Sequence, residues 1–87
     1  MPNLIFYREE DGRIPVLEWI ESLPQEARFA CIARIELLKA RGHELRRPHA
    51  DYLGDEIYEL RAKHRGVNYR MLYFFHGQSA VVLAHGF

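Results

Sequence analysis

Two neighbouring segments repeat their side-chain character every second residue, and this period constrains the fold more than any other feature of the sequence. In residues 56–63 an apolar set alternates with a charged set, namely Tyr58, Leu60, Ala62 and Glu59, Arg61, Lys63. In residues 67–75 one face holds Tyr69, Met71, Tyr73 and Phe75, and the other holds Arg70, Leu72 and Phe74. A period of two is typical of strands with one buried face. The short Arg65-Gly66 turn predicts that the two strands pair antiparallel.

The remaining segments predict one more strand on either side of two helices. A turn at residues 76–79 leads into an apolar segment, residues 80–87, which extends the meander. Residues 3–8 are rich in aromatic and branched side chains and predict a separate short strand. Helical spacing begins at Pro15, and a second helix should run from Pro24 to Arg41 with Gly42 as its stop. Residues 43–54 show no clear period and are interpreted as a loop.

The second helix has an unusual distribution of apolar residues. Its main apolar stripe comprises Ala27, Ala30, Cys31, Ile35 and Leu38. Phe29 and Ile32 lie off that stripe, which predicts a helix covered on two sides. Arg34 lies near the centre of the stripe and is the exception to this pattern. Ser22 and Gln25 have the spacing of a capping box at the start of the helix.

These elements predict an α+β fold in the order β-α-α-β-β-β, with both N-terminal helices packed on one face of a small, twisted, mainly antiparallel sheet. The 87 residues, 48% of them hydrophobic, suit one domain spanning residues 1–87. A single cysteine, Cys31, excludes an internal disulfide and fits a reducing compartment. No apolar run reaches the roughly 20 residues of a membrane span, and no signal peptide is visible, so we expect a cytoplasmic protein.

The zero net charge of the chain hides an uneven distribution. Residues 1–59 contain eight basic and twelve acidic side chains, whereas residues 60–87 contain four basic and no acidic ones. A charge difference between halves indicates a polyanion site better than the total does, although chance alone can produce such a split in a small protein.

Three cations, Arg61, Lys63 and Arg70, fall on the predicted sheet face that points away from the helices. Whether they meet depends on strand register, which the sequence does not give. If they meet, their repulsion favours an anion between them, and guanidinium groups bind phosphate in a bidentate way. Leu72 and Phe74 would then offer a surface on which a base could stack. The alternative is that the arginines pair with Glu59 or Glu56 as ordinary surface charges.

Other kinds of site have little support in the sequence. No two histidines have the spacing of a metal-binding pair with an acid between them, and the glycines are scattered in turns, so we expect no metal and no cofactor. Cys31 is interpreted as a core residue. Trp19 is expected to pack within the protein, with a role as a partner's anchor as the alternative.

Several segments together resemble a known family. They are Tyr58-Glu59-Leu60-Arg61, then residues 69–75 (YRMLYFF), then residues 83–87 (LAHGF), with residues 19–24 and 42–53 upstream. In this order they resemble the phage-derived HigB-like branch of the RelE/ParE toxin superfamily, over nearly the whole chain. The resemblance implies a small twisted sheet with two N-terminal helices, in agreement with the pattern above.

The resemblance also implies a function, that of a type II toxin that cuts mRNA in the ribosomal decoding site. Its partner would be a helix-turn-helix antitoxin, and it would oligomerise only through that antitoxin or as a weak dimer. By position, Arg61 and Arg70 would stabilise charge in catalysis, and His64 and His85 would be the candidates for proton transfer. Glu59 would be an internal partner for a cation. RNA would be bound by four further residues: Lys63, Arg65, Leu72 and Phe74.

One departure from the family keeps an alternative open. The family usually continues beyond the HGF motif with a basic stretch, whereas this sequence stops at Phe87, as a short, trimmed or inactivated toxin would. The alternative function is a non-catalytic, toxin-like module that binds a helix-turn-helix antitoxin and regulates its operon. A gyrase-directed toxin of the ParE branch is a third possibility, which the LYFF and HGF motifs favour less.

Overall fold

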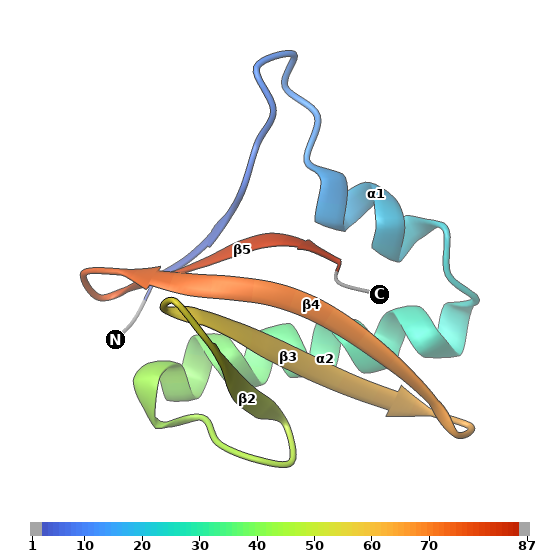
Figure 1. The fold of residues 1–87 in the computed structure, drawn as a ribbon. Helices are drawn as coiled ribbons and strands as arrows, with labels where there is room; N and C mark the ends of the chain where they lie inside the picture. The colour runs from blue at the N-terminus through green and yellow to red at the C-terminus, as the bar shows by residue number, and fades with distance from the viewer. Residues whose placement is uncertain (1–2, 86–87) are drawn as a thin grey trace.

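The computed structural model describes residues 3–85, and the side chains of residues 3–82 (Figure 1). Its α-helices are α1 (Pro15–Glu21) and α2 (Gln25–Arg41), and a short 3-10 helix, η1 (Gly42–Glu44), follows α2. Its strands are β1 (Asn3–Phe6), β2 (Ala50–Gly54), β3 (Ile57–His64), β4 (Val67–His76) and β5 (Ser79–His85). The predicted α+β class is confirmed, with one strand more than the sequence indicated.

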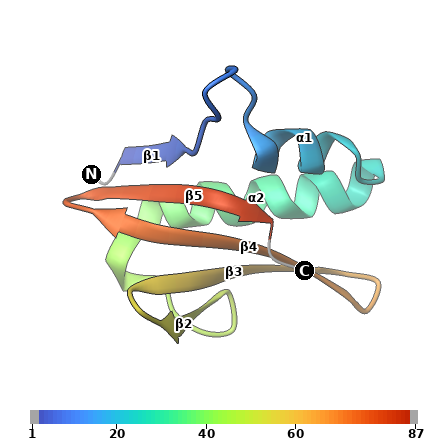
Figure 2. The ribbon, with the colours of Figure 1, turned by 45° about the horizontal axis from the view of Figure 1, so that its top comes forward.

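The strands form one sheet in the order β1-β5-β4-β3-β2 (Figure 2). The predicted antiparallel meander is confirmed for β3, β4 and β5. The first strand joins the far edge of the meander by pairing parallel to β5, so the sheet is mixed. This strand is shorter than residues 3–8, although the Tyr7 amide still donates to the Val82 carbonyl at 2.8 Å.

The prediction of a loop over residues 43–54 is wrong for its last part, which forms the edge strand β2. This strand pairs antiparallel to β3, and its register shifts between Tyr52 and Gly54. Only Ala50 is fully buried in it, while Tyr52 and Leu53 are exposed. An edge strand that buries one side chain has no two-residue hydrophobic period, which explains why the pattern did not show it.

Both helices cover the same face of the sheet, as predicted (Figure 2). The main stripe of α2 is buried there as Ala27, Cys31, Ile35 and Leu38. The prediction that α2 is covered on two sides is wrong for the described part of the chain. Phe29 is 57% exposed and Ile32 is 42% exposed, so this second face is open.

The junction between the helices differs from the predicted capping box. Ser22 caps the C-terminus of α1, and its hydroxyl donates to the Trp19 carbonyl. Pro24 occupies the N-cap of α2 and provides no side-chain hydrogen bond. The predicted stop at Gly42 is confirmed, because this residue is the C-cap of α2 with φ of 54°, a value that favours glycine.

The core lies between the helices and the sheet and contains the predicted inward set of β3 and β4. Leu60, Met71 and Tyr73 are almost fully buried in it. Cys31 is a core residue, as expected, and burial raises the pKa of its thiol to about 11. Trp19 packs partly buried against this core, its ring centroid 6.3 Å from that of Tyr69. Among the described residues, no helix has the length and apolar character needed to cross a membrane.

Candidate functional site

The register of β3 and β4 places the two predicted arginines directly opposite each other. Arg61 pairs with Arg70 across the hairpin, on the sheet face that points away from the helices. Two like charges at opposed positions repel each other, so this pair needs a neighbouring anion. The sequence left open whether these two arginines meet, and the structure brings them together.

A buried carboxylate provides that anion in the structure. Glu59 is only 4% exposed, and its two oxygens divide between the arginines. Arg70 Nε lies 3.1 Å from Glu59 Oε1, and Arg61 Nη2 lies 3.3 Å from Glu59 Oε2. Glu59 therefore pairs internally with cations, as expected. The two arginines both face each other and pair with Glu59, so the two arrangements considered from the sequence occur together.

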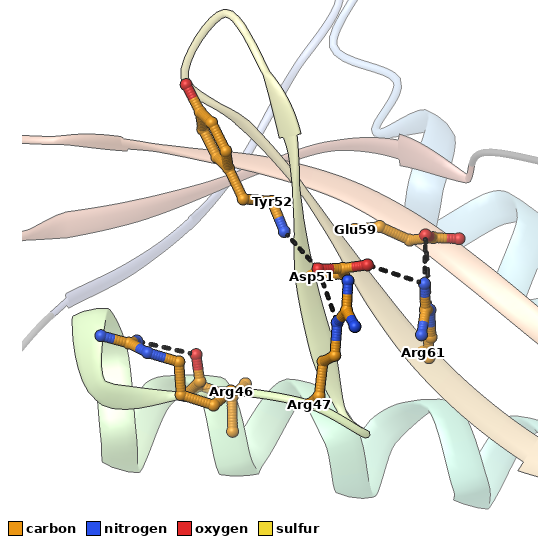
Figure 3. Close-up of polar contacts among 7 residues, drawn as sticks. Arg46, Arg47, Asp51, Tyr52, Glu59 and Arg61 are labelled. Carbon is orange, nitrogen blue, oxygen red and sulfur yellow. Dashed lines mark hydrogen bonds and ion pairs between the residues drawn. The ribbon is translucent and has the colours of Figure 1, made fainter.

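Asp51 on β2 extends this cluster toward the edge of the sheet (Figure 3). Its Oδ2 lies 3.2 Å from Arg61 Nη2, and its Oδ1 accepts a hydrogen bond from Arg47 Nε at 3.0 Å. These contacts, foremost the hydrogen bond from Arg47, lower the pKa of the Asp51 carboxyl against an opposing contribution from burial. The chain of contacts therefore runs Arg47, Asp51, Arg61, Glu59, Arg70.

A hollow of about 500 Å³, here called the basic pocket, opens beside this chain of contacts. Four cations line it, together with a histidine and two uncharged residues: Arg34, Arg61, Lys63 and Arg70, with His49, Pro48 and Asn68. No carboxylate is part of its lining within residues 3–82. Since Glu59 and Asp51 balance only part of this charge, the pocket has the electrostatics of an anion site.

The basic pocket forms where β2 stops pairing with β3. The ladder between β2 and β3 stops at the pair Ala50 and Leu60, so β3 loses its neighbour beyond that point. One further bond, from the Arg61 amide to the His49 carbonyl at 2.8 Å, holds the incoming loop beside β3. The outer half of β3, with Lys63, is left as an open edge.

Sequence reasoning did not assign Arg34 and His49 to this site. Arg34 lies on α2, and its Nε is buried with no hydrogen-bond acceptor among the described residues. The sequence did hint at a role for Arg34, because it is a charged residue within the apolar stripe and must face something other than the core. His49 lay in the unpatterned segment and gave no signal.

The structure does not bring His64 to the arginine pair. It follows Leu60 and Ala62 on the helix-facing side of β3, where its Nε2 lies 3.0 Å from Glu26 Oε2. Arg65 Nη2 lies 3.6 Å from the same oxygen. Strand alternation separates His64 from the basic pocket, and Arg65 lies in the turn after β3. The lining of the pocket includes only Lys63 of the predicted RNA-binding residues.

The other predicted site residues lie further along the sheet. Leu72 pairs with Glu59 across the hairpin, and Phe74 follows two residues later on β4. Both side chains are half-buried, and neither lines the basic pocket. His85 ends β5 opposite Met71, and its side chain lies outside the described residues. In the part of the chain that the structure describes, no group of three or more His, Cys, Asp and Glu is placed to hold a metal ion.

Comparison with known proteins identifies the family. No curated protein matches the chain. The model of the family described as phage-derived protein Gp49-like (DUF891) matches residues 18–87, which include the second half of α1, all of α2 and all of β2 to β5. This is a toxin family of RelE-like type from toxin–antitoxin systems, and such a toxin has an antitoxin as its partner. With four-fifths of its length matched, the chain belongs to the phage-derived Gp49-like family of toxins.

Proposed function

We propose that this toxin is a ribosome-dependent mRNA endonuclease of the HigB-like branch, with a RelE-like fold, that acts in the cytoplasm and is silenced by a helix-turn-helix antitoxin. The observation that carries the proposal is the basic pocket, where four cations converge and no carboxylate enters the lining within residues 3–82. Family membership supports the toxin assignment, and the pocket supports a phosphate-bearing target.

The geometry of the arginine pair suits a phosphodiester. Arg61 and Arg70 are opposed on neighbouring strands, and Glu59 holds the two guanidinium groups beside each other. Arranged donors of this kind stabilise the negative charge that develops on a phosphate during transfer, and they need no reorganisation. Lys63 and Arg34 add further charge to the lining of the pocket.

The proposed reaction is attack of a ribose 2′-hydroxyl on the adjacent phosphorus. The O2′–P bond forms, the P–O5′ bond breaks, and the products are a 2′,3′-cyclic phosphate and a free 5′-hydroxyl. One group must accept the 2′ proton and another must protonate O5′. Imidazole can do either near neutral pH, and His49 lines the basic pocket, whereas His64 faces the other side of the sheet. We therefore assign one of these two proton transfers to His49 among the described histidines.

One observation favours a second candidate function. Both arginines of the pair already contact Glu59, and Arg61 also contacts Asp51. A cluster of ion pairs with this arrangement can be purely structural. The second candidate is thus a non-catalytic, toxin-like module that binds a helix-turn-helix antitoxin and regulates its operon.

Induced expression in bacteria distinguishes the two functions. We expect induction of the chain to arrest growth and to produce cuts in translated messages, and Arg70→Ala to reduce both about a hundredfold or more. Arg13→Ala is the matched control, because Arg13 is an exposed arginine whose partner, Asp11, lies in the same turn.

The contrary result is equally specific. If the folded chain is harmless when induced, leaves messages intact and still co-purifies with a small helix-turn-helix protein, the endonuclease proposal is wrong and the second candidate is favoured.

A further inference from the structure

A second hollow lies where the loop after α2 meets β2, and it combines aromatic rings with arginines. It measures about 600 Å³ and adjoins a smaller hollow of about 310 Å³. Three residues line both parts: His43, Tyr52 and Tyr58. Arg46 and Arg47 line the larger part, and Phe75 lines the smaller one. These six residues are here called the aromatic pocket, which the proposed cleavage chemistry does not use.

The rings of this pocket form a continuous aromatic cluster that starts in the core at Tyr73 and ends at the surface. The Tyr58 ring contacts Tyr52 in a tilted arrangement and Phe75 edge-on, with ring centroids 5.0 and 5.4 Å away and interplanar angles of 59° and 76°. The His43 ring lies on Phe75 with a centroid distance of 3.7 Å and an interplanar angle of 21°. The two Tyr58 distances fall in the range of 4.5–7 Å that aromatic pairs prefer, and the His43 ring lies closer and nearly flat on Phe75.

Core packing accounts for the inner rings but not for the outermost ones. Tyr52 is 53% exposed, and His43 is exposed as well. The Tyr52 hydroxyl accepts a hydrogen bond from the Glu56 amide at 3.0 Å, which fixes the ring in its position. A fixed and exposed aromatic ring is suited to stack against a flat ligand, because its entropy is already lost.

The charges around the pocket suit a flat ring that carries an anion. Arg46 Nη1 donates to the Leu45 carbonyl at 3.1 Å and to the His43 carbonyl, so its guanidinium group is held at the pocket wall. Asp51 is a lining carboxylate, but Arg47 and Arg61 both contact it. Glu56, in the smaller hollow, is the other acidic residue of the described lining.

We propose that the aromatic pocket binds one nucleotide unit, with its base stacked on Tyr52 and its phosphate near Arg46 and Arg47. The contacts Arg47–Asp51–Arg61 cross β2 and join this pocket to the basic pocket (Figure 3). A single strand of RNA could therefore place one base here and a neighbouring phosphate in the basic pocket. Only the choice of RNA as the source of the nucleotide rests on the proposed function.

Titration of the purified chain with mononucleotides, followed by NMR, tests the inference. Adenosine and cytidine 5′-monophosphates should shift the signals of His43 and Tyr52, whereas ribose 5-phosphate, which has no base, should not. Tyr52→Ala should weaken nucleotide binding about fivefold or more, because stacking is worth about 1–3 kcal/mol per base. Tyr52→Phe keeps the ring but loses the hydrogen bond from Glu56, so it should weaken binding less than Tyr52→Ala does. Phe29→Ala is the control, as Phe29 is an exposed aromatic residue on α2 outside this pocket.

The remaining outcomes separate this inference from the proposed function. Equal binding by Tyr52→Ala and the unchanged chain overturns the pocket assignment, even if Arg70→Ala still abolishes toxicity. Binding of a short oligoribonucleotide that is tighter than that of the mononucleotides, and that weakens in Arg61→Ala, supports RNA as the source. If the oligoribonucleotide and the mononucleotides bind with equal affinity, and Arg61→Ala changes neither affinity, the ligand is a free nucleotide. That result overturns RNA as the source of the nucleotide.

Discussion

At the scale of single residues, Glu59 determines how two arginines can share one surface. A buried carboxylate between two opposed guanidinium groups offsets the repulsion that this register would otherwise cause. The pair costs desolvation energy, and breaking it by removing one partner is strongly unfavourable. The cluster can therefore be tested through its carboxylate.

Glu59→Gln should lower the free energy of unfolding by about 1–3 kcal/mol, since it leaves Arg61 and Arg70 opposed without their anion. Urea denaturation provides the measurement, and the exposed Glu56→Gln is the control. Inorganic phosphate should stabilise the Glu59→Gln variant more than the unchanged chain, because the uncharged glutamine no longer balances the two guanidinium groups and a bound anion can. Equal stability of all three chains would contradict the account of the cluster.

The Asp51 carboxyl gives a second test at this scale. Its pKa is lowered from 3.8, with the hydrogen bond from Arg47 as the largest cause. A carboxyl whose pKa is lower in the folded state adds stability above pH 3.8, and this stability is lost as the pH falls through the folded pKa. NMR titration should place the pKa of Asp51 closer to 3.8 in Arg47→Gln than in Arg61→Gln. The reverse order would assign the dominant contact to Arg61.

At the scale of elements, α2 has one face that holds the fold together and one that does not. Leu38→Ala should cost about 2–5 kcal/mol, because the residue is fully buried and a cavity remains. Ile32→Ala, on the exposed face of the same helix, should cost far less, since surface substitutions usually stay within about 0.5 kcal/mol. Thermal unfolding compares the two directly. A large loss for Ile32→Ala would show that this face is covered.

The same scale shows what the sequence could and could not predict. The period of two in β3 and β4 predicted which side chains face the core and that Arg61 and Arg70 share the outer face, because one buried face enforces alternation. The register of the two strands depends on how the hairpin closes, so the sequence pattern could not predict that Arg61 and Arg70 lie directly opposite each other. Strand β2 was missed because it buries one side chain, Ala50.

Contacts between elements determine which of the candidate residues lie in the same site. His64 is next to Lys63 in sequence, yet alternation places it on the helix side with Glu26. Arg34 is 27 positions before Arg61, yet α2 brings it to the same pocket. A sequence pattern predicts the face on which a residue lies, whereas the residues that meet in a pocket are determined by packing between elements.

At the scale of the whole molecule, the charge asymmetry of the sequence becomes a local excess of cations. The acid-free segment that begins at Leu60 contributes Arg61, Lys63 and Arg70, and the helix adds Arg34. The parallel pairing of β1 with β5 completes the sheet at the opposite edge, away from this pocket. The fold therefore concentrates positive charge at one end of β3 in a chain of zero net charge.

The central claim is that the basic pocket holds the phosphate backbone of RNA. The most direct measurement is the affinity of the purified chain for a short single-stranded RNA as a function of salt concentration. Each phosphate-bound cation contributes about −0.7 to the slope of log K against log salt, so four cations predict a slope of about −3. Lys63→Ala should make the slope less negative by about 0.7, and Lys39→Ala, on the outer side of α2, should leave it unchanged. A slope near zero for the unchanged chain, or equal slopes for both lysine variants, would contradict the claim.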